Sequence, residues 1–164
     1  MKVGDITSEE MQELISFANA DKMFGVAFKG ALSQIRHKLH LQKQGYEIEE
    51  NHSSNKGLPD FIVNGHLVEH KRARNESYSD GKIKVEIQKS RKSGDCKSNR
   101  LYDATFCTVV AVDIGEHTGK KNDYRYINVN SLERHVDFPD KIKVFQKQNK
   151  SWKNSLSEAL NESR

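Results

Sequence analysis

The stretch Pro59-Asp60-Phe61-Ile62-Val63-Asn64-Gly65-His66-Leu67-Val68-Glu69-His70-Lys71 decides the local fold of this chain. The pair Asn64-Gly65 favours the type I′ turn of a two-residue β-hairpin, and the residues on either side of it, 60–63 and 66–71, form the two predicted strands. A loop of this length also fixes the facing pairs, which are Val63 with His66, Ile62 with Leu67, and Phe61 with Val68. The sequence therefore predicts a hairpin in one defined register.

One step further along this register, Asp60 lies directly opposite Glu69, with the two Cβ atoms roughly 5 Å apart. Side chains alternate along a strand, so Lys71 shares the face of the two carboxylates, whereas His70 points to the other face as a packed or hydrogen-bonded residue. Two carboxylates placed opposite each other repel, and a chain keeps such a pair when a cation lies between them. The candidates for that cation are a divalent metal ion and the ammonium group of Lys71.

The motif Pro59-Asp60, followed after eight residues by Glu69-His70-Lys71, resembles the signature of the PD-(D/E)XK nuclease superfamily. That superfamily includes many restriction endonucleases, Holliday junction resolvases and repair nucleases. The resemblance implies that Asp60 and Glu69 bind Mg²⁺, with Mn²⁺ as an alternative ion, and that the main-chain carbonyl of His70 assists them. Lys71 would then help to activate the attacking water. The competing interpretation is a surface hairpin whose charged residues form solvated ion pairs.

The same resemblance implies an α/β fold in which a central mixed β-sheet is flanked by helices, a restriction endonuclease-like core. It covers residues 28–129 and is most specific at the hairpin. A chain of 164 residues is expected to form a single domain, 1–164. Many superfamily members carry a Glu on the helix before the first strand, where this chain has Gln34, so the number of bound metal ions stays open. Glu47, Glu49 or Glu50 is an alternative source of that carboxylate.

Several superfamily members also place a Gln on the helix after the strand that carries the ExK residues, and Gln88 is the corresponding candidate. Residues 82–93 are predicted as a helix, in which Gln88 and Lys92 lie one turn apart and could reach metal-bound water or phosphate. Apolar residues alternate from Ile83 to Ile87, so a strand is the alternative for this segment.

Helices and strands alternate in the rest of the pattern. A capping box that starts at Thr7 begins a first helix, which ends near Ala20. A break at 21–25 separates it from a second helical stripe, which Gly45 ends. The remaining predicted elements are strands at 46–50, 106–114, 124–129 and 142–145, a polar connection at 75–81, a short helix capped by Ser131 and a terminal helix at 151–160.

The His and Cys residues do not form a zinc-site pattern. His37 and His40 lie three residues apart on the second predicted helix without a Cys or acidic partner, so positions on the helix surface are expected. Cys96 and Cys107 form no CxxC pair, which favours a reduced, cytoplasmic protein. The sequence shows no signal-peptide pattern and no apolar stretch of roughly 20 residues, so no membrane association is expected.

Positive charge is concentrated just after the hairpin. The chain has a net charge of +4, but residues 71–100 hold ten Lys or Arg against four Asp or Glu, a net of +6. A phosphate backbone has to lie here if the hairpin is catalytic, so this segment is the predicted nucleic-acid interface. The residues expected to contact nucleic acid are Arg72, Arg74, Lys82, Lys84, Lys89, Arg91 and Lys92.

Together these features predict a Mg²⁺-dependent endonuclease that acts on duplex or branched DNA, with the catalytic residues Asp60, Glu69, Lys71 and Gln88. Cutting both strands with one site per chain calls for two copies, so a homodimer is expected. The first alternative is a catalytically silent nucleic-acid-binding module with the same fold, which the departure at Gln34 favours. The second alternative, a hydrolase of small phosphorylated metabolites, is weaker because the sequence has no Gly-rich phosphate loop.

Overall fold

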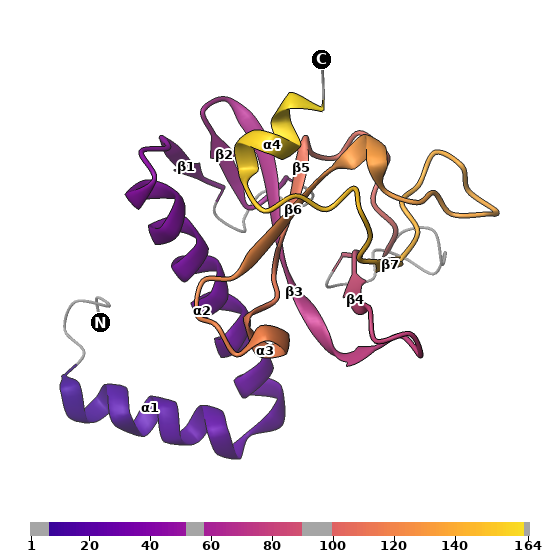
Figure 1. Cartoon of the computed structure of the whole chain (residues 1–164). Coiled ribbons are helices and arrows are strands. Elements are labelled where there is room, and N and C mark those ends of the chain that lie inside the picture. Colours follow the sequence, from indigo (N-terminus) through magenta and orange to yellow (C-terminus); the bar gives the residue numbers. More distant parts are fainter. Residues whose placement is uncertain (1–6, 52–57, 90–99, 163–164) are drawn as a thin grey trace.

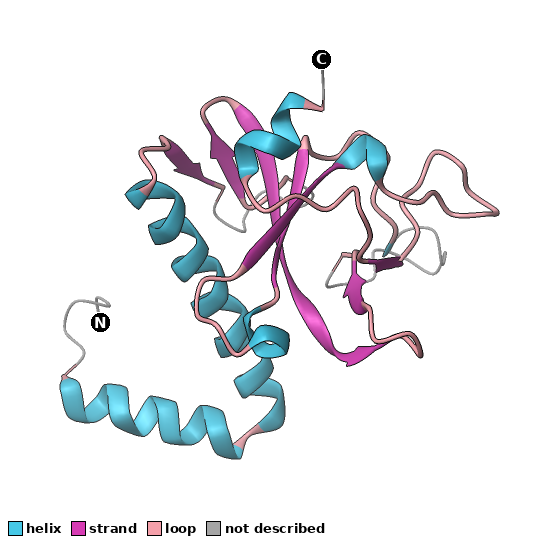
Figure 2. Ribbon diagram, viewed as in Figure 1, coloured by secondary structure: helices cyan, strands magenta, loops and turns pink. Residues whose placement is uncertain are grey.

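The computed structural model describes residues 7–51, 58–89 and 100–162 (Figure 1). They form an α/β fold in which helices flank a mixed β-sheet, as the sequence predicts (Figure 2). The helices are α1 (Ser8–Ala20), α2 (Lys22–Lys43), α3 (Gly115–Thr118) and α4 (Leu156–Asn161), with a 3-10 turn at Val129–Ser131. The strands are β1 (Ile48–Glu50), β2 (Phe61–Val63), β3 (His66–Ser77), β4 (Ile83–Glu86), β5 (Val109–Asp113), β6 (Tyr124–Asn128) and β7 (Phe145–Lys147).

Strand β3, which is 12 residues long, is the centre of the sheet. Its first half pairs with β2 in antiparallel and with β5 in parallel orientation, and its second half pairs with β4 in antiparallel orientation. Antiparallel strands β1, β7 and β6 extend the sheet beyond β2, β4 and β5. One parallel pair among antiparallel pairs makes the sheet mixed. Strands β1, β5 and β6 lie within the strands predicted at 46–50, 106–114 and 124–129.

The β2–β3 hairpin has the predicted register, with all three expected residue pairs present. Asn64 and Gly65 have φ values of 46° and 81°. A type I′ turn needs a positive φ at both positions, which Asn and Gly adopt at low cost. The side chain of Asn64 also accepts a hydrogen bond from the Glu47 N–H at 2.8 Å, which joins the turn to the residues before β1.

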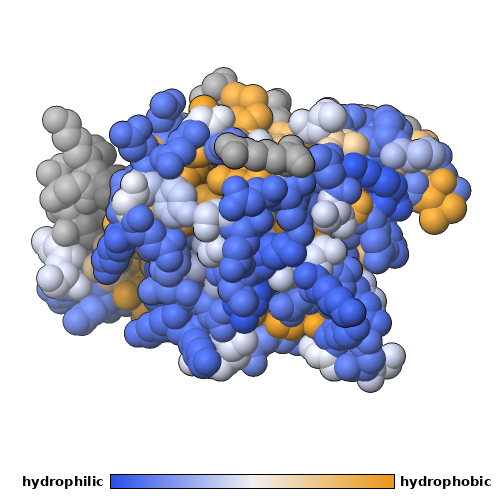
Figure 3. Space-filling model, turned by 45° about the horizontal axis from the view of Figure 1, so that its top comes forward, coloured by the Kyte–Doolittle hydropathy of each residue, from blue (hydrophilic) through white to orange (hydrophobic). Residues whose placement is uncertain are grey.

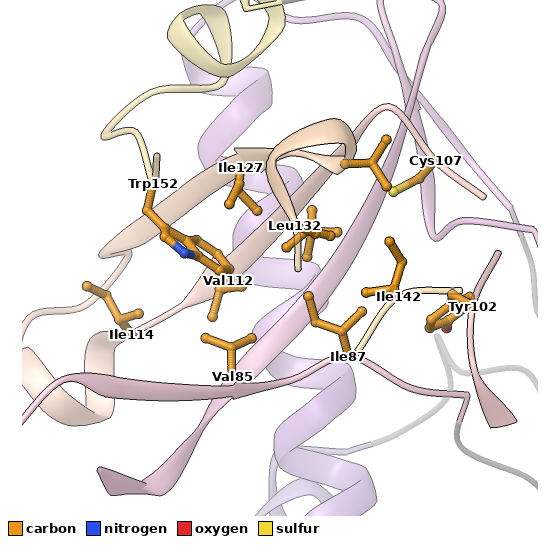
Figure 4. Close-up of a cluster of buried hydrophobic side chains, with 12 residues drawn as sticks. Val85, Ile87, Tyr102, Cys107, Val112, Ile114, Ile127, Leu132, Ile142 and Trp152 are labelled. Atoms are coloured by element: carbon orange, nitrogen blue, oxygen red, sulfur yellow. The ribbon is translucent and has the colours of Figure 1, made fainter. Parts of the chain in front are cut away.

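Two hydrophobic clusters lie on opposite faces of the sheet. Helices α2 and α4 cover one face, where Tyr126 is among the buried residues. On the other face, Ile87 and Trp152 belong to a second cluster (Figure 4). Because side chains alternate along β3, His70 points to α2 and Glu69 points to the second cluster. We call these two sides of the sheet the α2 face and the carboxylate face.

Helices α1 and α2 meet at a corner, and α1 runs across the end of α2, away from the sheet (Figure 1). The predicted capping box at Thr7 is present. Asp21 both ends α1 and caps α2, so the predicted break at 21–25 is only one residue long. Gly25 is required here, because a Cβ at this position would overlap the carbonyl oxygen of Ala18.

The predicted helix at 82–93 is wrong in its first part, where the chain forms β4. The alternating residues Ile83, Val85 and Ile87 all pack into the cluster on the carboxylate face, which requires a strand and not a helix. Residues 90–93 lie outside the described ranges.

Other predicted boundaries also move. The polar segment predicted as a connection at 75–81 begins as strand, because β3 continues to Ser77. Ser131 ends a 3-10 turn that Asn128 caps, and it begins no helix. The later elements are displaced. Strand β7 begins at the last residue of the strand predicted at 142–145, and α4 overlaps only the second half of the helix predicted at 151–160.

The surface reflects the high content of charged residues, which is 30% of the chain. Figure 3 shows a mostly hydrophilic face with small apolar patches. Within the described ranges, none of the helices has the length and apolar character needed to cross a membrane.

Candidate active site

Asp60 lies one residue before β2, at the start of the hairpin. Its Oδ2 accepts a hydrogen bond from the N–H of His70 at 2.8 Å, so the carboxylate reaches across the hairpin to β3. Burial, followed by repulsion from Glu69, raises the pKa of Asp60 from 3.8 to about 6. The raised pKa thus reflects first the cost of burying a carboxylate and second the cost of placing it beside Glu69, which the hairpin register requires.

Glu69 is buried, with 4% of its surface exposed. Its Oε1 accepts two hydrogen bonds, from the hydroxyl of Tyr102 at 2.7 Å and from the ammonium group of Lys71 at 2.5 Å. Lys71 Nζ also lies 3.2 Å from the Tyr102 oxygen. The structure therefore brings Asp60, Glu69 and Lys71 together on the carboxylate face, with Tyr102 as a fourth member.

Tyr102 is the site residue that sequence reasoning missed. Its ring stacks on Phe106, with centroids 3.9 Å apart, and the ammonium groups of Lys71 and Lys89 lie 5.2 and 5.9 Å from the ring centroid. Burial and the nearby Glu69 raise the pKa of Tyr102, so its hydroxyl remains a hydrogen-bond donor. Tyr102 precedes β5 in a segment without periodic pattern, so the sequence held no signal for its position.

Two carboxylates and a main-chain carbonyl are the groups that could hold a metal ion. The His70 N–H points to Asp60, and a paired strand residue directs its C=O toward the same edge as its N–H, so the His70 carbonyl lies on that edge. Among the described residues, no three His, Cys, Asp or Glu side chains gather into a metal site. This donor set fits Mg²⁺, which commonly keeps several waters and takes one or two carboxylates.

The α2 face of β3 carries a buried hydrogen-bond network. The Ser33 hydroxyl donates to Asp113 at 2.5 Å, and Ser33 Oγ lies 2.9 Å from His70 Nε2, which must then be the donor to Ser33. Burial lowers the pKa of His70 to about 4, so the ring is neutral at pH 7. These contacts confirm that His70 is a hydrogen-bonded residue behind the carboxylates.

His37 is completely buried, so the predicted position on the helix surface is wrong. Its ring lies between α2 and the sheet, 5.0 Å from the ring of His70 and 4.6 Å from that of Tyr124. Burial lowers the pKa of His37 well below its usual value. The sequence pattern predicts a polar, surface residue at His37. In the structure, the neutral imidazole instead packs as a flat ring in the interior.

Gln88 is placed differently from the other predicted catalytic residues. Its amide donates a hydrogen bond to Glu86, whose carboxylate also pairs with Arg74 at 2.6 Å. The predicted helix on which Gln88 and Lys92 lie one turn apart starts as strand β4, and Lys92 lies outside the described residues. No contact between described residues joins Gln88 to the two carboxylates.

The predicted nucleic-acid-binding residues do not share one surface. Arg72 and Arg74 point away from the carboxylate face, because side chains alternate along β3. Lys89 lies beside Tyr102 at the site. The ion-pair partners are Glu116 for Arg72, Glu86 for Arg74, Asp80 for Lys82 and Glu76 for Lys84. Arg91 and Lys92 are not among the described residues.

The acidic residues that could replace the Glu missing at Gln34 differ in their surroundings. Glu47 and Glu49 are exposed. Glu50 is half-buried at the end of β1, next to β2, and pairs with Lys38 of α2 at 2.7 Å. Of these three acidic residues, Glu50 is therefore the one that contacts α2, and Lys38 offsets its charge.

The mixed sheet, its flanking helices and the central hairpin define an α/β fold. The chain is similar in structure to a bacterial homing endonuclease, I-Ssp6803I, with a TM-score of 0.54 over 84% of this chain and 94% of that chain. The two sequences are 12% identical, so the similarity establishes a shared fold. No family model matches the chain, and a search of curated proteins finds no match.

Proposed function

We propose that this chain is a metal-dependent endonuclease that hydrolyses phosphodiester bonds of DNA at a PD-(D/E)XK-type site. The observation that supports this best is the convergence of Asp60, Glu69 and Lys71 on one face of β3, with Glu69 buried. Solvated ion pairs on a surface hairpin would leave these groups exposed and the pKa of Asp60 near its usual value. The similarity in fold to a homing endonuclease supports DNA as the substrate.

In the proposed site, Asp60, Glu69 and the main-chain carbonyl of His70 would hold Mg²⁺, or Mn²⁺ in its place. A bound ion of this kind polarises a phosphate oxygen and lowers the pKa of a coordinated water. Lys71 is oriented by Glu69 and Tyr102, so its ammonium group can position the attacking water and offset negative charge that develops on the phosphate. Tyr102 is a positioning residue, because it acts through these two side chains.

The raised pKa of Asp60 gives the proposed reaction a pH dependence. Below about pH 6, Asp60 is mostly protonated in the metal-free protein, so Asp60 would have to lose that proton in order to bind a metal ion. Cleavage at limiting Mg²⁺ is therefore expected to rise with pH through this region. Saturating Mg²⁺ should move the rise to lower pH, because the ion favours the carboxylate.

On this proposal, residues 1–164 form one nuclease domain with one site. A homodimer related by a twofold axis would cut both strands of a duplex, whereas a monomer would leave nicks. Duplex and branched DNA are both candidate substrates, since the loops around the site determine which one binds.

The deciding experiment is DNA cleavage with and without metal. The protein and its Lys71→Ala variant are incubated with supercoiled plasmid, linear duplex and a four-way junction, each in Mg²⁺, Mn²⁺ or EDTA. We expect metal-dependent cutting that Lys71→Ala loses, and the preferred substrate defines the specificity. Lys150→Ala is the control, because Lys150 is exposed and distant in sequence from the hairpin.

The second candidate is a catalytically silent nucleic-acid-binding module, which Gln34 in place of the usual Glu favours. DNA binding without cutting in any metal would establish it and overturn the nuclease. Calorimetry separates the two without relying on turnover. A nuclease binds Mg²⁺ and loses that binding in Asp60→Asn, whereas a silent module needs no metal at Asp60 and Glu69.

A further inference from the structure

A cleft of about 420 Å³ opens on the α2 face, between α2, the end of β5 and the loop of residues 115–122. Figure 1 shows α3, which belongs to this loop, close to α2 and β3. Five cationic side chains line the cleft: Lys29, Arg36, Arg72, Lys120 and Lys121. Two acidic side chains line it as well, Asp113 and Glu116, so the charge of the lining is +3.

Both acidic side chains are already held by other parts of the protein. Glu116 pairs with Arg72 at 2.5 Å. Asp113 accepts hydrogen bonds from the Ser33 hydroxyl at 2.5 Å and from the Gly115 N–H at 2.9 Å. Both carboxylates therefore already have partners. Neither of them forms an ion pair with the remaining cations of the cleft.

Among the described residues, the four remaining cations, Lys29, Arg36, Lys120 and Lys121, form no salt bridge, and only Lys120 has an acidic neighbour outside the cleft, since its charge helps Thr118 and Arg125 to lower the pKa of Asp123. Lys29 and Arg36 are seven residues apart on α2, which is two helical turns and places them on one side of the helix. All four side chains are exposed, so water and salt screen part of their mutual repulsion, and an anion bound in the cleft would offset the rest.

The loop that carries two of these lysines has a defined shape. A Cβ on Gly115 would lie 2.7 Å from the carbonyl oxygen of Lys120, so the loop folds back closely at this point. Gly119 and Asn122 have φ values of 69° and 58°, which complete the reversal. Lys120 and Lys121 are thus presented by a closely folded loop, which lowers the entropic cost of binding a ligand.

We propose that this cleft is a second phosphate-binding site, separate from the carboxylate face. Phosphate suits the lining, since Lys acts as a point charge and the Arg fork binds two phosphate oxygens at once. The volume is that of a site for one nucleotide or a short backbone segment. The phosphate can belong to bound DNA, which rests on the proposed nuclease function, or to a free phosphorylated molecule.

The position of the cleft defines its role if the ligand is DNA. Arg72 follows Lys71 directly on β3 but points to the opposite face, so the cleft cannot hold the phosphate that is being cut. It would bind a flanking part of the strand that extends past the sheet. The cleft then contributes to affinity and to the choice of DNA shape, and not to the chemical step.

The first test is DNA affinity, measured in EDTA with the Asp60→Asn protein so that neither cutting nor metal contributes. Lys120→Gln/Lys121→Gln is compared with Lys43→Gln/Lys150→Gln, which removes the same charge from exposed lysines outside the cleft. For a short labelled duplex, the cleft variant should bind about tenfold more weakly, with a salt slope reduced by about 2. The control should change by less than about threefold.

Arg36→Gln is a second, independent variant, because it lies on α2 and leaves the loop intact. Equal losses in the cleft and control variants would show that only total charge matters and would overturn the assignment of DNA to the cleft. The same comparison with inorganic pyrophosphate then decides whether a free phosphorylated molecule is the ligand.

The second test locates the ligand by the amide NMR signals of Gly115 and Gly119, with Gly45 and Gly81 as internal controls. Shifts of the first pair with duplex but not with pyrophosphate identify DNA as the source of the phosphate, and shifts with pyrophosphate alone identify a free phosphorylated molecule. No shift with either probe overturns the proposal. If the protein does not cut DNA but shows these shifts, the proposed nuclease function is wrong and the proposed phosphate-binding cleft stands.

Discussion

The two faces of β3 hold buried polar groups in opposite ways. On the carboxylate face, Asp60 and Glu69 lie together, and Lys71 is the cation that pairs with Glu69. On the α2 face, the carboxylate of Asp113 is bound by a hydroxyl and a main-chain N–H, and the adjoining His70 is neutral. One strand thus has an excess of negative charge on one side and a nearly complete network on the other.

The difference shows which buried carboxylates serve the fold and which are suited to bind a cation. A network that satisfies its own charges stabilises the fold without a ligand. The raised pKa of Asp60 beside the buried Glu69 shows that its charged form is disfavoured in the free protein, and such groups cluster where a ligand supplies the missing charge. The carboxylate face is therefore the better candidate for a metal, although both faces contain acidic residues.

The largest expected effect separates the two faces by activity. Asp60→Ala should lower metal-dependent cleavage by at least about 1000-fold, because one of the two carboxylates proposed to bind the metal is lost. Asp113→Asn should keep cleavage at saturating DNA within about tenfold, because its partners lie on the α2 face. Single-turnover cleavage assays measure both. Equal losses would remove the distinction between the faces.

The α2 face should dominate stability in acid. The pKa of His70 is lowered from 6.5 to about 4 in the folded state, so the unfolded chain binds more protons between these values. Stability should therefore fall as the pH drops below 6.5, by about 3 kcal/mol near pH 4 from this group. Urea unfolding of the Asp60→Asn protein across this range measures it, and a flat profile would contradict a buried neutral His70.

The carboxylate face should show the opposite slope. Asp60 has a folded pKa near 6, above its usual 3.8, so the folded state binds more protons between these values and this contribution is lost as pH rises. Asp60→Asn should therefore stabilise the metal-free protein by about 2 kcal/mol at pH 8, after allowance for partial exposure, and by little at pH 3.5. Urea unfolding in EDTA tests this, and Mg²⁺ should stabilise only the unmodified protein.

Tyr102→Phe should give the smallest effect and refine the description of the carboxylate face. The variant keeps the stacking on Phe106 but removes the hydroxyl bonded to Glu69 and Lys71, at a cost of about 1 kcal/mol in stability and about tenfold in cleavage. Tyr78→Phe, at a half-buried position away from the site, is the control. Unchanged cleavage in Tyr102→Phe would mean that Glu69 alone orients Lys71.

The part of the site that could be predicted is the part that the hairpin determines locally. A two-residue turn sets the register by sequence neighbours alone, so Asp60, Glu69 and Lys71 could be placed together without knowledge of the remaining fold. Tyr102 and Ser33 reach β3 from segments more than 30 residues away, as the Tyr102 to Glu69 contact shows. Contacts of this kind depend on tertiary packing and leave no periodic signal.

The misassigned segments failed for physical reasons that can be stated for each. Residues 82–93 combine polar residues that suit a helix with an apolar alternation that suits a strand. Packing of the apolar side chains against the core stabilises a strand at Ile83–Glu86. The lack of a Cys or acidic partner predicts a surface position for His37, yet the neutral ring is a suitable core group. In both cases tertiary context outweighed local preference.

The tight hairpin makes the site sensitive to chain length as well as to composition. Eight residues separate Asp60 from Glu69, and a two-residue turn is too short to accommodate an insertion or a deletion without a change in register. Gain or loss of one residue between Asp60 and the turn would turn Asp60 toward α2, and the same change between the turn and Glu69 would turn Glu69 there. Such a change would separate the two carboxylates as effectively as a substitution, while leaving every charged side chain of the protein in place.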